Sequence, residues 1–403
     1  GEDGKIIQRL PFYESSQGAA IWSMSDDGKV ACGWYDGSMY GDIIIWKNGE
    51  RVDTGNYSGQ GVVVSANGKY VGGGCGKGMV RPSNKPFIWS EEEGLTIIQD
   101  GPEGIYYGFV QGISNDGKTA VGYVGLDSDM TVGRHPFIIK DGVYHDLTGN
   151  MSGCLLADYE IGQRKELKGL PEDGYLIKTI VTSNMADAIA EHYNVGLIEC
   201  LTGFKYIGQQ ILGFETKGKG EYLFGFEESY GCLIGTHARD KDAIVATMAL
   251  CEAAAYYRTK GMTLWDAMIE MYERYGYYKD DIQSITMKGI EGLEKIRQIL
   301  ATLRSEPPKE IAGYKVLKVR DYQADTIRDM ETGEVTATGL PNSNVLYYEL
   351  PDGAWVCVRP SGTEPKVKFY YGVKGTSLTD ADVKSDEMGK AIMEMVKNLD
   401  KAV

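Results

Sequence analysis

An arginine followed by a tight polar turn lies near the C-terminal end of the chain, in RPSGTEPK at residues 359–366. The guanidinium of Arg359 is a planar fork that can bind two oxygens of a phosphate group. Ser361 and Thr363 add hydroxyl donors, and Gly362 lets backbone N–H groups approach an anion closely. These residue types indicate an anion site, but they are also typical of ordinary polar turns between strands.

Two adjacent carboxylates and a serine follow an apolar run in EYLFGFEESYG, residues 221–231. A strand would deliver them into a glycine-flanked loop, where carboxylates can accept hydrogen bonds from neighbouring sugar hydroxyls. A solvated acidic turn is the alternative interpretation of the same residues. The pattern alone therefore leaves a sugar-binding loop and a surface turn both open.

Cations stand in two further motifs. THARDKD at 236–242 contains Arg239 and Lys241 beside an expected helix start, where the positive end of the helix dipole favours an anion. LTGFKYIG at 201–208 places Lys205 at another glycine-marked helix start. The alternatives are a capping turn with Asp240 as the N-cap and an ordinary surface lysine.

Helical and strand patterns that could position these motifs alternate after residue 146. Helical periodicity predicts helices at 184–193, 241–258, 263–276 and 282–304. Thr263 is expected to cap the third helix. Short apolar runs predict strands at 175–181, 195–200 and 221–226. This alternation indicates an α/β layered domain over residues 147–305.

A second, smaller domain is expected after the EPPKE segment, which ends the preceding helix and forms a linker. Its strands are predicted in the runs KVLKVRDYQ, NVLYYEL, AWVCVRP and KVKFYYGV. A helix near residues 379–399 follows them. Residues 306–403 are therefore predicted to form a small α+β domain that carries the Arg359 turn.

The first 146 residues are predicted to form an all-β segment of about three repeats. SMSDDGKVACGWYDG, VVSANGKYVGGGCGKG and GISNDGKTAVGYVGLD resemble one another, with turn glycines at Gly28, Gly68 and Gly117. Asp-Gly and Asn-Gly are typical of two-residue hairpin turns. A period of roughly 40–50 residues with several strands per unit indicates propeller blades or a similar β array. Because a closed propeller has about four to eight blades, the array is expected to be open or completed by another chain.

The composition and charge of the chain indicate which partners it can bind and in which cellular compartment it is expected. The net charge of −15 leaves no basic field for nucleic acid. No apolar run approaches the roughly 20 residues of a membrane helix, and no signal peptide is recognisable. Seven cysteines without a C-x-x-C pair indicate small buried residues in a reducing compartment. We expect a cytoplasmic protein, with a secreted or cell-surface one as the alternative because the repeats resemble those of secreted bacterial proteins.

Taken together and in this order, KTIVTS, LTGFKYIG, FGFEESYG, THARDKD and RPSGTEPKVKFYYGV resemble the α-D-phosphohexomutases, most closely the phosphoglucomutase/phosphomannomutase type. The resemblance runs from about residue 147 to the C-terminus and matches the third and fourth of four family domains. It implies that hexose phosphate is the ligand and that sugar hydroxyls contact Glu227 and Ser229. It also implies that the phosphate that does not react is held by Arg359, Ser361, Gly362 and Thr363. Lining the same cleft would be Lys205 and Arg239.

Two family loops are absent from this sequence. The family phosphoserine loop, T-A-S-H-N-P, has no counterpart, and neither has the D-x-D-x-D-R loop that holds Mg²⁺ in the complete family enzyme. The nearest imitation of a metal loop, Asp127-Ser128-Asp129, offers too few oxygen ligands for a hard cation. We therefore expect a chimeric protein that binds hexose phosphate, has no catalytic or metal residues of its own and does not complete turnover alone.

Two other interpretations remain open. A working enzyme would receive its catalytic groups from a second chain. A non-enzymatic surface or glycan-binding protein would instead use the β-repeats, fused to a mutase fragment. Its aromatic side chains could stack on glycans, or they could form the core of the repeats. The aromatics in question are Trp34, Tyr35, Tyr106 and Tyr107.

Overall fold

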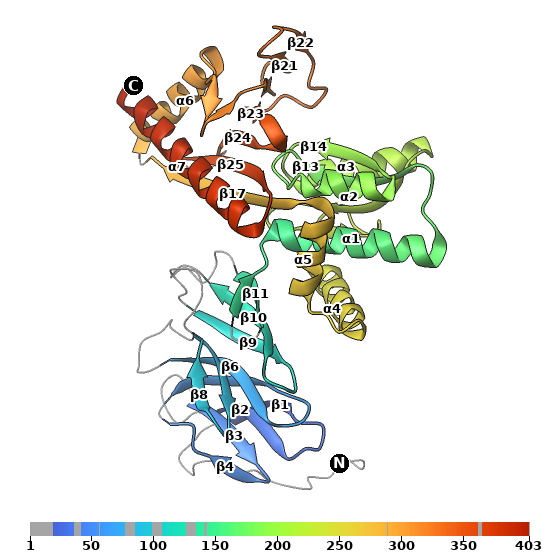
Figure 1. The fold of residues 1–403 in the computed structure, drawn as a ribbon, viewed down its shortest axis with the longest axis vertical. Helices are drawn as coiled ribbons and strands as arrows, with labels where there is room; N and C mark the ends of the chain where they lie inside the picture. Colours follow the sequence, from blue (N-terminus) through green and yellow to red (C-terminus); the bar gives the residue numbers. More distant parts are fainter. Residues whose placement is uncertain are drawn as a thin grey trace. The chain divides into compact units, whose positions relative to one another are not determined.

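A computed structural model describes residues 19–35, 42–55, 57–76, 85–98, 107–125, 134–140, 143–287, 289–361 and 365–402. The chain divides into two compact units, Gly1–Thr148 and Gly149–Val403. The first contains the β-repeats, and the second contains the α/β and C-terminal domains. Figure 1 gives the labels of their helices and strands.

Three four-stranded antiparallel repeats make up the first unit. The first repeat consists of β1 (Ala19–Met24), β2 (Val30–Tyr35), β3 (Asp42–Lys47) and β4 (Glu50–Val52). The second consists of β5 (Ser58–Val64), β6 (Tyr70–Gly76), β7 (Lys85–Ser90) and β8 (Gly94–Ile97). The third consists of β9 (Tyr107–Ile113), β10 (Thr119–Gly125), β11 (Arg134–Lys140) and β12 (Val143–Asp146). The first two repeats join in one eight-stranded sheet and the third forms its own sheet.

The predicted hairpins are confirmed in all three repeats, but their turns are longer than two residues: β1 ends at Met24, for example, and β2 begins at Val30. Gly28, Gly68 and Gly117 have φ of 70°, 71° and 71°, a left-handed conformation that glycine adopts without strain. In each turn a serine hydroxyl bonds to the Asp or Asn two residues later and accepts the backbone N–H five residues later. Successive turns are also joined, because Asp26 N donates to Ala66 O at 3.0 Å and Asn67 N donates to Asn115 Oδ1 at 2.9 Å. The repeats are therefore stacked turn upon turn.

Apolar side chains fill the spaces between neighbouring repeats. One cluster joins the first repeat to the second, including Cys32, Ile45, Val71 and Phe87. Another joins the second repeat to the third, including Val63, Ile88, Val110 and Phe137. The sheets of the described strands do not close into a barrel or propeller, so the propeller-like arrangement stays a prediction.

The aromatic residues proposed to stack on glycans lie mostly inside the repeats. Tyr35 is 5% exposed and Tyr107 is 4% exposed, while Trp34 is half-buried. Tyr106 and the Asp127-Ser128-Asp129 segment lie outside the described residues. Burial of Tyr35 and Tyr107 favours the core interpretation over glycan stacking, because a stacking platform must be open to its ligand.

The α/β domain is built on a sheet with the order β14-β13-β15-β16. β13 pairs in parallel with both β14 and β15, and β16 is antiparallel. The strands are β13 (Gly174–Thr179), β14 (Gly196–Cys200), β15 (Glu221–Phe226) and β16 (Cys232–Ile234). The helices are α1 (Gly149–Lys168), α2 (Met185–Tyr193), α3 (Phe204–Lys217), α4 (Ala243–Thr259) and α5 (Leu264–Tyr275).

Most predicted elements of this domain are confirmed to within a few residues. Thr263 caps α5 in a reciprocal capping box with Asp266. The predicted N-cap of α4 was wrong: Asp242, not Asp240, accepts the N–H groups of Ile244 and Val245. In the sequence DKDAIV both aspartates are good caps, and the choice follows from where the helical backbone begins.

The predicted helix over 282–304 was also wrong in its first part. Tyr277–Thr286 forms β17, which pairs along its whole length with β25 (Lys366–Gly375), and the helix α6 spans Gly289–Ser305. The partner strand supplies backbone hydrogen bonds that override the local helical pattern. Both β17 and α6 consequently pack with the C-terminal domain rather than with the α/β domain.

The C-terminal domain has a seven-stranded sheet with the order β17-β25-β24-β23-β20-β21-β22. Its other strands are β20 (Lys318–Asp321), β21 (Thr326–Asp329), β22 (Val335–Thr336), β23 (Leu346–Glu349) and β24 (Trp355–Pro360), with a small hairpin of β18 (Glu310–Ile311) and β19 (Tyr314–Lys315) beside it. Helix α7 (Leu378–Ala402) lies across the β17 and β25 side of the sheet (Figure 1). Alternating residues of β24 and β25 face α6 and α7, including Val356, Val358, Val367 and Phe369.

All seven cysteines are free, and six of them are buried. Cys251 is exposed, so its expected burial was wrong. It lies on an outward side of α4, where an apolar sequence run does not face the core. No helix within the described ranges is long and apolar enough to cross a membrane.

Candidate functional site

The loop that follows β15 lies at the edge of the sheet where the parallel strands end. β13, β14 and β15 all have their carboxyl ends at this edge, which is where ligands bind in open α/β sheets. Glu227, Glu228 and Ser229 follow β15 directly. The loop is closed by a 2.7 Å hydrogen bond from Glu227 N to Gly231 O.

Glu227 is buried and holds the start of a helix. Only 6% of it is exposed, and its Oε1 accepts a 2.8 Å hydrogen bond from the N–H of Gly203, which precedes α3. Its Oε2 lies 3.7 Å from the ammonium of Lys241. The negative charge thus meets both the positive end of the α3 dipole and a cation. This carboxylate is fixed in place with one oxygen turned toward a charged neighbour.

The remainder of the loop is strained and closely packed. Ser229 is exposed, and Tyr230 has a φ of 66°, which a bulky residue rarely adopts. Gly149, at the start of α1, lies beneath the loop: a Cβ there would stand 1.9 Å from the carbonyl oxygen of Glu228. The absence of a side chain at Gly149 therefore allows the loop its position.

Two cations lie directly opposite each other on the C-terminal sheet. Arg359 of β24 and Lys368 of β25 are cross-strand partners. Further along the same strands and on the same face, Cys357 and Tyr370 pack against Ile180 of the α/β domain. Since side chains alternate along a strand, Arg359 and Lys368 belong to the face that meets the α/β domain. Like charges in direct opposition destabilise a strand pair, and an anion between them would relieve this repulsion.

The predicted turn begins where these strands end. Ser361 N donates to Lys366 O at 2.8 Å, which closes the hairpin. Gly362 and Thr363, two of the four predicted phosphate-binding residues, lie outside the described residues. The role of the turn in holding phosphate stays a prediction.

Glu228 connects the loop with the two cations. Burial raises the pKa of Glu228 to about 7, and the negative charge of Glu227 adds to this, while the charges of Lys368 and Arg359 lower it. The same carboxyl and Arg359 act in opposite directions on the pKa of Tyr370, which burial raises to about 12. The loop after β15 and the cationic face of the hairpin therefore lie close enough to form a single site.

The two remaining predicted residues both lie beside α3. Lys205 is exposed in the first turn of the helix, with its ammonium 4.8 Å from the ring centre of Tyr206. Arg239 forms an ion pair with Glu215, near the last turn, and donates to the carbonyl of Thr236 at 2.7 Å. The backbone of Arg239 lies beside Gly208, where an added Cβ would stand 2.6 Å from its carbonyl oxygen, but its guanidinium extends to Glu215. Lys205 is therefore near the Glu227 loop, whereas the guanidinium of Arg239 is turned away from it.

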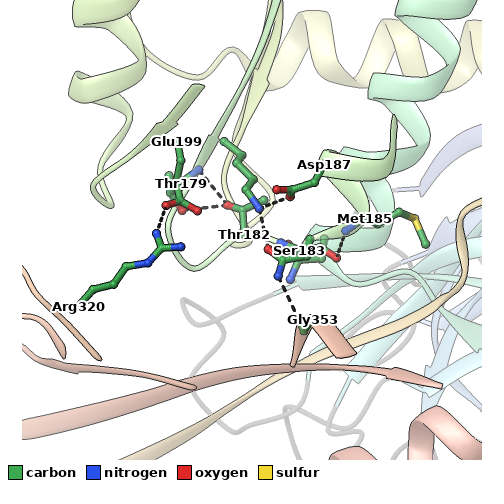
Figure 2. A network of polar contacts seen from close by, with 11 residues as sticks. Thr179, Thr182, Ser183, Met185, Asp187, Glu199, Arg320 and Gly353 are labelled. Atoms are coloured by element: carbon green, nitrogen blue, oxygen red, sulfur yellow. Dashed lines mark hydrogen bonds and ion pairs between the residues drawn. The ribbon is translucent and has the colours of Figure 1, made fainter. Parts of the chain in front are cut away.

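Polar contacts fix the two domains against each other beside the site (Figure 2). Arg320 of β20 donates to Glu199 of β14 at 2.7 Å and to Glu349 of its own sheet at 2.6 Å. Asn184 donates to the carbonyl of Gly353 at 3.2 Å. A shared apolar cluster accompanies these bonds, with members from both domains. The distance between the two halves of the site is therefore set by a packed interface.

A buried lysine beneath this interface is fully engaged in structural contacts. Lys178, at the end of β13, is 1% exposed and donates to Asn184 Oδ1 at 2.7 Å and to Asp187. Burial raises the pKa of the nearby Asp280 to about 6, against the lowering effect of Ser183 and Lys178. These groups support the loop after β13 rather than offering a ligand site.

The donor side chains of the described residues form no arrangement suited to a hard cation. Among the described residues no group of three or more His, Cys, Asp or Glu side chains is arranged to hold one. Hard cations such as Mg²⁺ require several oxygen ligands.

Comparison with known proteins places this site in a family. Residues 148–275 match the family model of phosphoglucomutase/phosphomannomutase alpha/beta/alpha domain III, and residues 304–390 match the C-terminal domain of the same family. This part of the chain belongs to the phosphoglucomutase/phosphomannomutase family. The segment between the two matches of this mutase part contains β17 and α6.

Individual relatives of the mutase part carry the same name. A phosphoglucomutase of Staphylococcus epidermidis is 33% identical over 275 residues, covering 66% of this chain and 48% of the relative. One of Staphylococcus aureus is 35% identical over 240 residues, covering 60% and 42%. The chain thus spans about half the length of the curated relatives it matches.

Solved mutase structures resemble the same region. The phosphoglucomutase pp63/parafusin of Paramecium, in its open form, aligns with a TM-score of 0.42 and 16% identity over 66% of this chain and 43% of its own. A phosphoglucomutase/phosphomannomutase family protein of Burkholderia thailandensis aligns with a TM-score of 0.37 and 12% identity over 70% and 47%.

Lys368 was not among the predicted residues of the mutase-like site, and Lys241 and Glu228 stood in the predicted motifs without a role of their own. Lys241 contacts Glu227, Lys368 opposes Arg359, and Glu228 faces both cations of the hairpin. The alternation in KVKFYY places Lys368 on the same face as Tyr370, so this residue could have been found from the sequence. The burial of Glu228 depends on two domains meeting and left no signal in the sequence.

Proposed function

We propose that the mutase part of the chain binds a hexose phosphate between the loop after β15 and the β24–β25 hairpin. The observation that supports this most strongly is the opposed pair Arg359 and Lys368, which form no ion pair with a carboxylate of the described residues and face the α/β domain. Two adjacent cations suit a phosphate dianion. The guanidinium would contribute two parallel hydrogen bonds and the ammonium a point charge.

The sugar would lie toward the α/β domain in this proposal. Glu227 is held by Gly203 and Lys241 and can accept a hydrogen bond from a sugar hydroxyl, while the exposed hydroxyl of Ser229 can donate or accept one. Lys205 and the backbone of residues 361–363 would complete the site. The relatives are named phosphoglucomutase, which favours a glucose phosphate as the ligand.

Binding is tested by calorimetric titration with glucose 6-phosphate, with glucose as the comparison. Loss of a charge-assisted bidentate contact in Arg359→Ala removes about 1.5–3 kcal/mol, so the Kd should rise about 10- to 100-fold. Arg297→Ala, an exposed arginine on α6 with a side chain 74% exposed, is the matched control and should leave the Kd unchanged. Equal affinity of Arg359→Ala and the wild type would contradict the proposed site.

We further propose that this chain does not complete a mutase cycle by itself. The 403-residue sequence contains neither the phosphoserine loop nor the metal loop of the family, and both supply large parts of the rate enhancement. A coupled assay from glucose 1-phosphate to glucose 6-phosphate, with Mg²⁺ and a bisphosphate activator, should show no turnover. Turnover that disappears in Arg359→Ala would contradict this, and turnover only after adding a separate first half of a mutase would identify a second chain as partner.

A reducing, cytoplasmic setting is proposed for the protein. Six of its seven free thiols are buried, and oxidising compartments usually pair cysteines in disulfides. Fractionation of cells that express the chain should recover it in the cytoplasm with all thiols available to a label after unfolding. Recovery with disulfides would favour the secreted alternative.

A further inference from the structure

One carboxylate oxygen at the proposed site is buried without a partner. Glu228 Oε2 is inaccessible to solvent and has no hydrogen-bond partner among the residues that the structure describes. The backbone of the same residue packs closely on α1, because a Cβ added at Gly149 would stand 1.9 Å from the carbonyl oxygen of Glu228. Burying an ionised carboxylate oxygen without a partner is unfavourable by several kcal/mol, whereas a neutral carboxyl is much easier to bury.

The charged groups around Glu228 come from three elements. Glu227 precedes it in its own loop, Arg359 lies on β24 and Lys368 lies on β25. The negative charge of Glu228 also raises the pKa values of Cys357 and Tyr370 on the same two strands. The carboxyl thus interacts electrostatically with Glu227 and with the two cations that the proposed phosphate would contact.

Binding of an anion at Arg359 and Lys368 favours protonation of the Glu228 carboxyl. While the site is empty, Arg359 and Lys368 favour the ionised carboxylate. A bound dianion neutralises these cations and repels a second negative charge, so it favours the protonated carboxyl. A protonated carboxyl also offers an O–H donor where an ionised one offers only acceptors.

We propose that Glu228 takes up a proton when an anion binds at Arg359 and Lys368, so that this carboxyl makes phosphate binding proton-linked. The inference rests on the proposed function, since it requires an anion at these two cations. Because coupling is reciprocal, protonation of Glu228 tightens anion binding by the same factor by which the anion favours protonation. Burial that holds the pKa of Glu228 near 7 puts this linkage in the physiological range.

The sign of the pH dependence follows from the linkage. Below the pKa of the empty site, Glu228 is already protonated and affinity is at its maximum. Above that pKa, proton uptake accompanies binding, and the Kd rises by up to about tenfold per pH unit. The rise ends when the pH exceeds the higher pKa of the occupied site. Between pH 6 and pH 8 we expect about a tenfold weaker Kd.

Sulfate is the probe, because it keeps its charge over this range whereas a phosphate monoester has a pKa of about 6. Calorimetric titrations of the full chain at pH 6, 7 and 8 in two buffers of different ionisation enthalpy give both the Kd and the number of protons taken up. The wild type should take up close to one proton at pH 8. Glu228→Gln should take up none and should bind at pH 8 nearly as tightly as the wild type binds at pH 6.

Control variants separate this inference from the proposed function. Glu160→Gln removes another half-buried carboxyl, on α1, whose pKa is also raised by burial, and it should keep the wild-type pH dependence. Sulfate binding that is abolished by Arg359→Ala but does not vary with pH would overturn the role of Glu228 alone. Absence of sulfate binding at pH 6 would overturn the proposed site itself. The proton count in the wild type decides the question even if Glu228→Gln folds poorly.

Discussion

Replacing Arg320 by alanine should loosen the contact between the α/β domain and the C-terminal domain. Arg320 donates to Glu199 of one domain at 2.7 Å and to Glu349 of the other at 2.6 Å, and its guanidinium lies 4.8 Å from the ring centre of Tyr347. The substitution removes both ion pairs and leaves two carboxylates without a shared cation. It tests whether this contact holds the two halves of the candidate site together.

The expected magnitude follows from burial. A charge-assisted hydrogen bond contributes about 1.5–3 kcal/mol, but all three side chains are about one-quarter exposed, at 24%, 26% and 27%, so solvent screening reduces each bond. Taking about 1 kcal/mol for each bond and about 0.5–1 kcal/mol for the aromatic contact gives a loss of about 3 kcal/mol. Glu199→Gln, which keeps an acceptor, should lose less than half of this.

Urea denaturation and sulfate titration measure the two consequences. Arg320→Ala should lower the free energy of unfolding by about 3 kcal/mol and raise the Kd for sulfate several-fold. Arg328→Ala, an exposed arginine on the neighbouring strand β21, is the control and should change neither. If Arg320→Ala behaves like this control in both measurements, the ion pairs do not position the site. A double-mutant cycle with Glu199→Gln isolates the interdomain part.

Two further substitutions test the surroundings of the site. Gly149→Ala places a Cβ 1.9 Å from the Glu228 carbonyl, so the loop must shift, and sulfate affinity should fall several-fold despite the better helix propensity; unchanged affinity would show that the loop position is not critical. Asp280→Asn addresses pH: burial raises the folded-state pKa of Asp280 to about 6, so this group stabilises the fold fully only at acid pH, and its contribution is lost as the pH rises from about 4 to about 6. Relative to the wild type, the variant should gain about 3 kcal/mol of unfolding free energy between pH 4 and pH 7, and a constant difference would refute this.

The sequence alone predicted those helices, strands and turns whose formation depends on residues close together in the chain. The run EYLFGF predicts β15 with the bounds Glu221–Phe226, and Thr263 predicts the start of α5. The D-G-K and N-G-K turns likewise predict the hairpins of the repeats, because glycine tolerates the positive φ that they need. These features depend on neighbours within a few positions in the chain.

Sequence reasoning failed where a distant partner decides the outcome. Tyr277–Thr286 becomes a strand because β25 offers it a continuous ladder of backbone hydrogen bonds, although the following segment is helical. Arg239 stands in a cationic motif, yet Glu215 draws it toward the far end of α3. The state of Glu228 is set by Arg359 and Lys368, more than 100 residues away along the chain. Such effects depend on tertiary packing, which no local period encodes.

The stacked turns of the first unit imply a particular kind of folding energetics. Within the part of the chain that the structure describes, the apolar clusters and turn-to-turn hydrogen bonds join each repeat only to the next. The free energy of unfolding of such an array is approximately the sum of the intrinsic stability of each repeat and the coupling free energy between neighbouring repeats. Lengthening the array by one whole repeat would therefore add one fixed increment of free energy and leave the other junctions as they are.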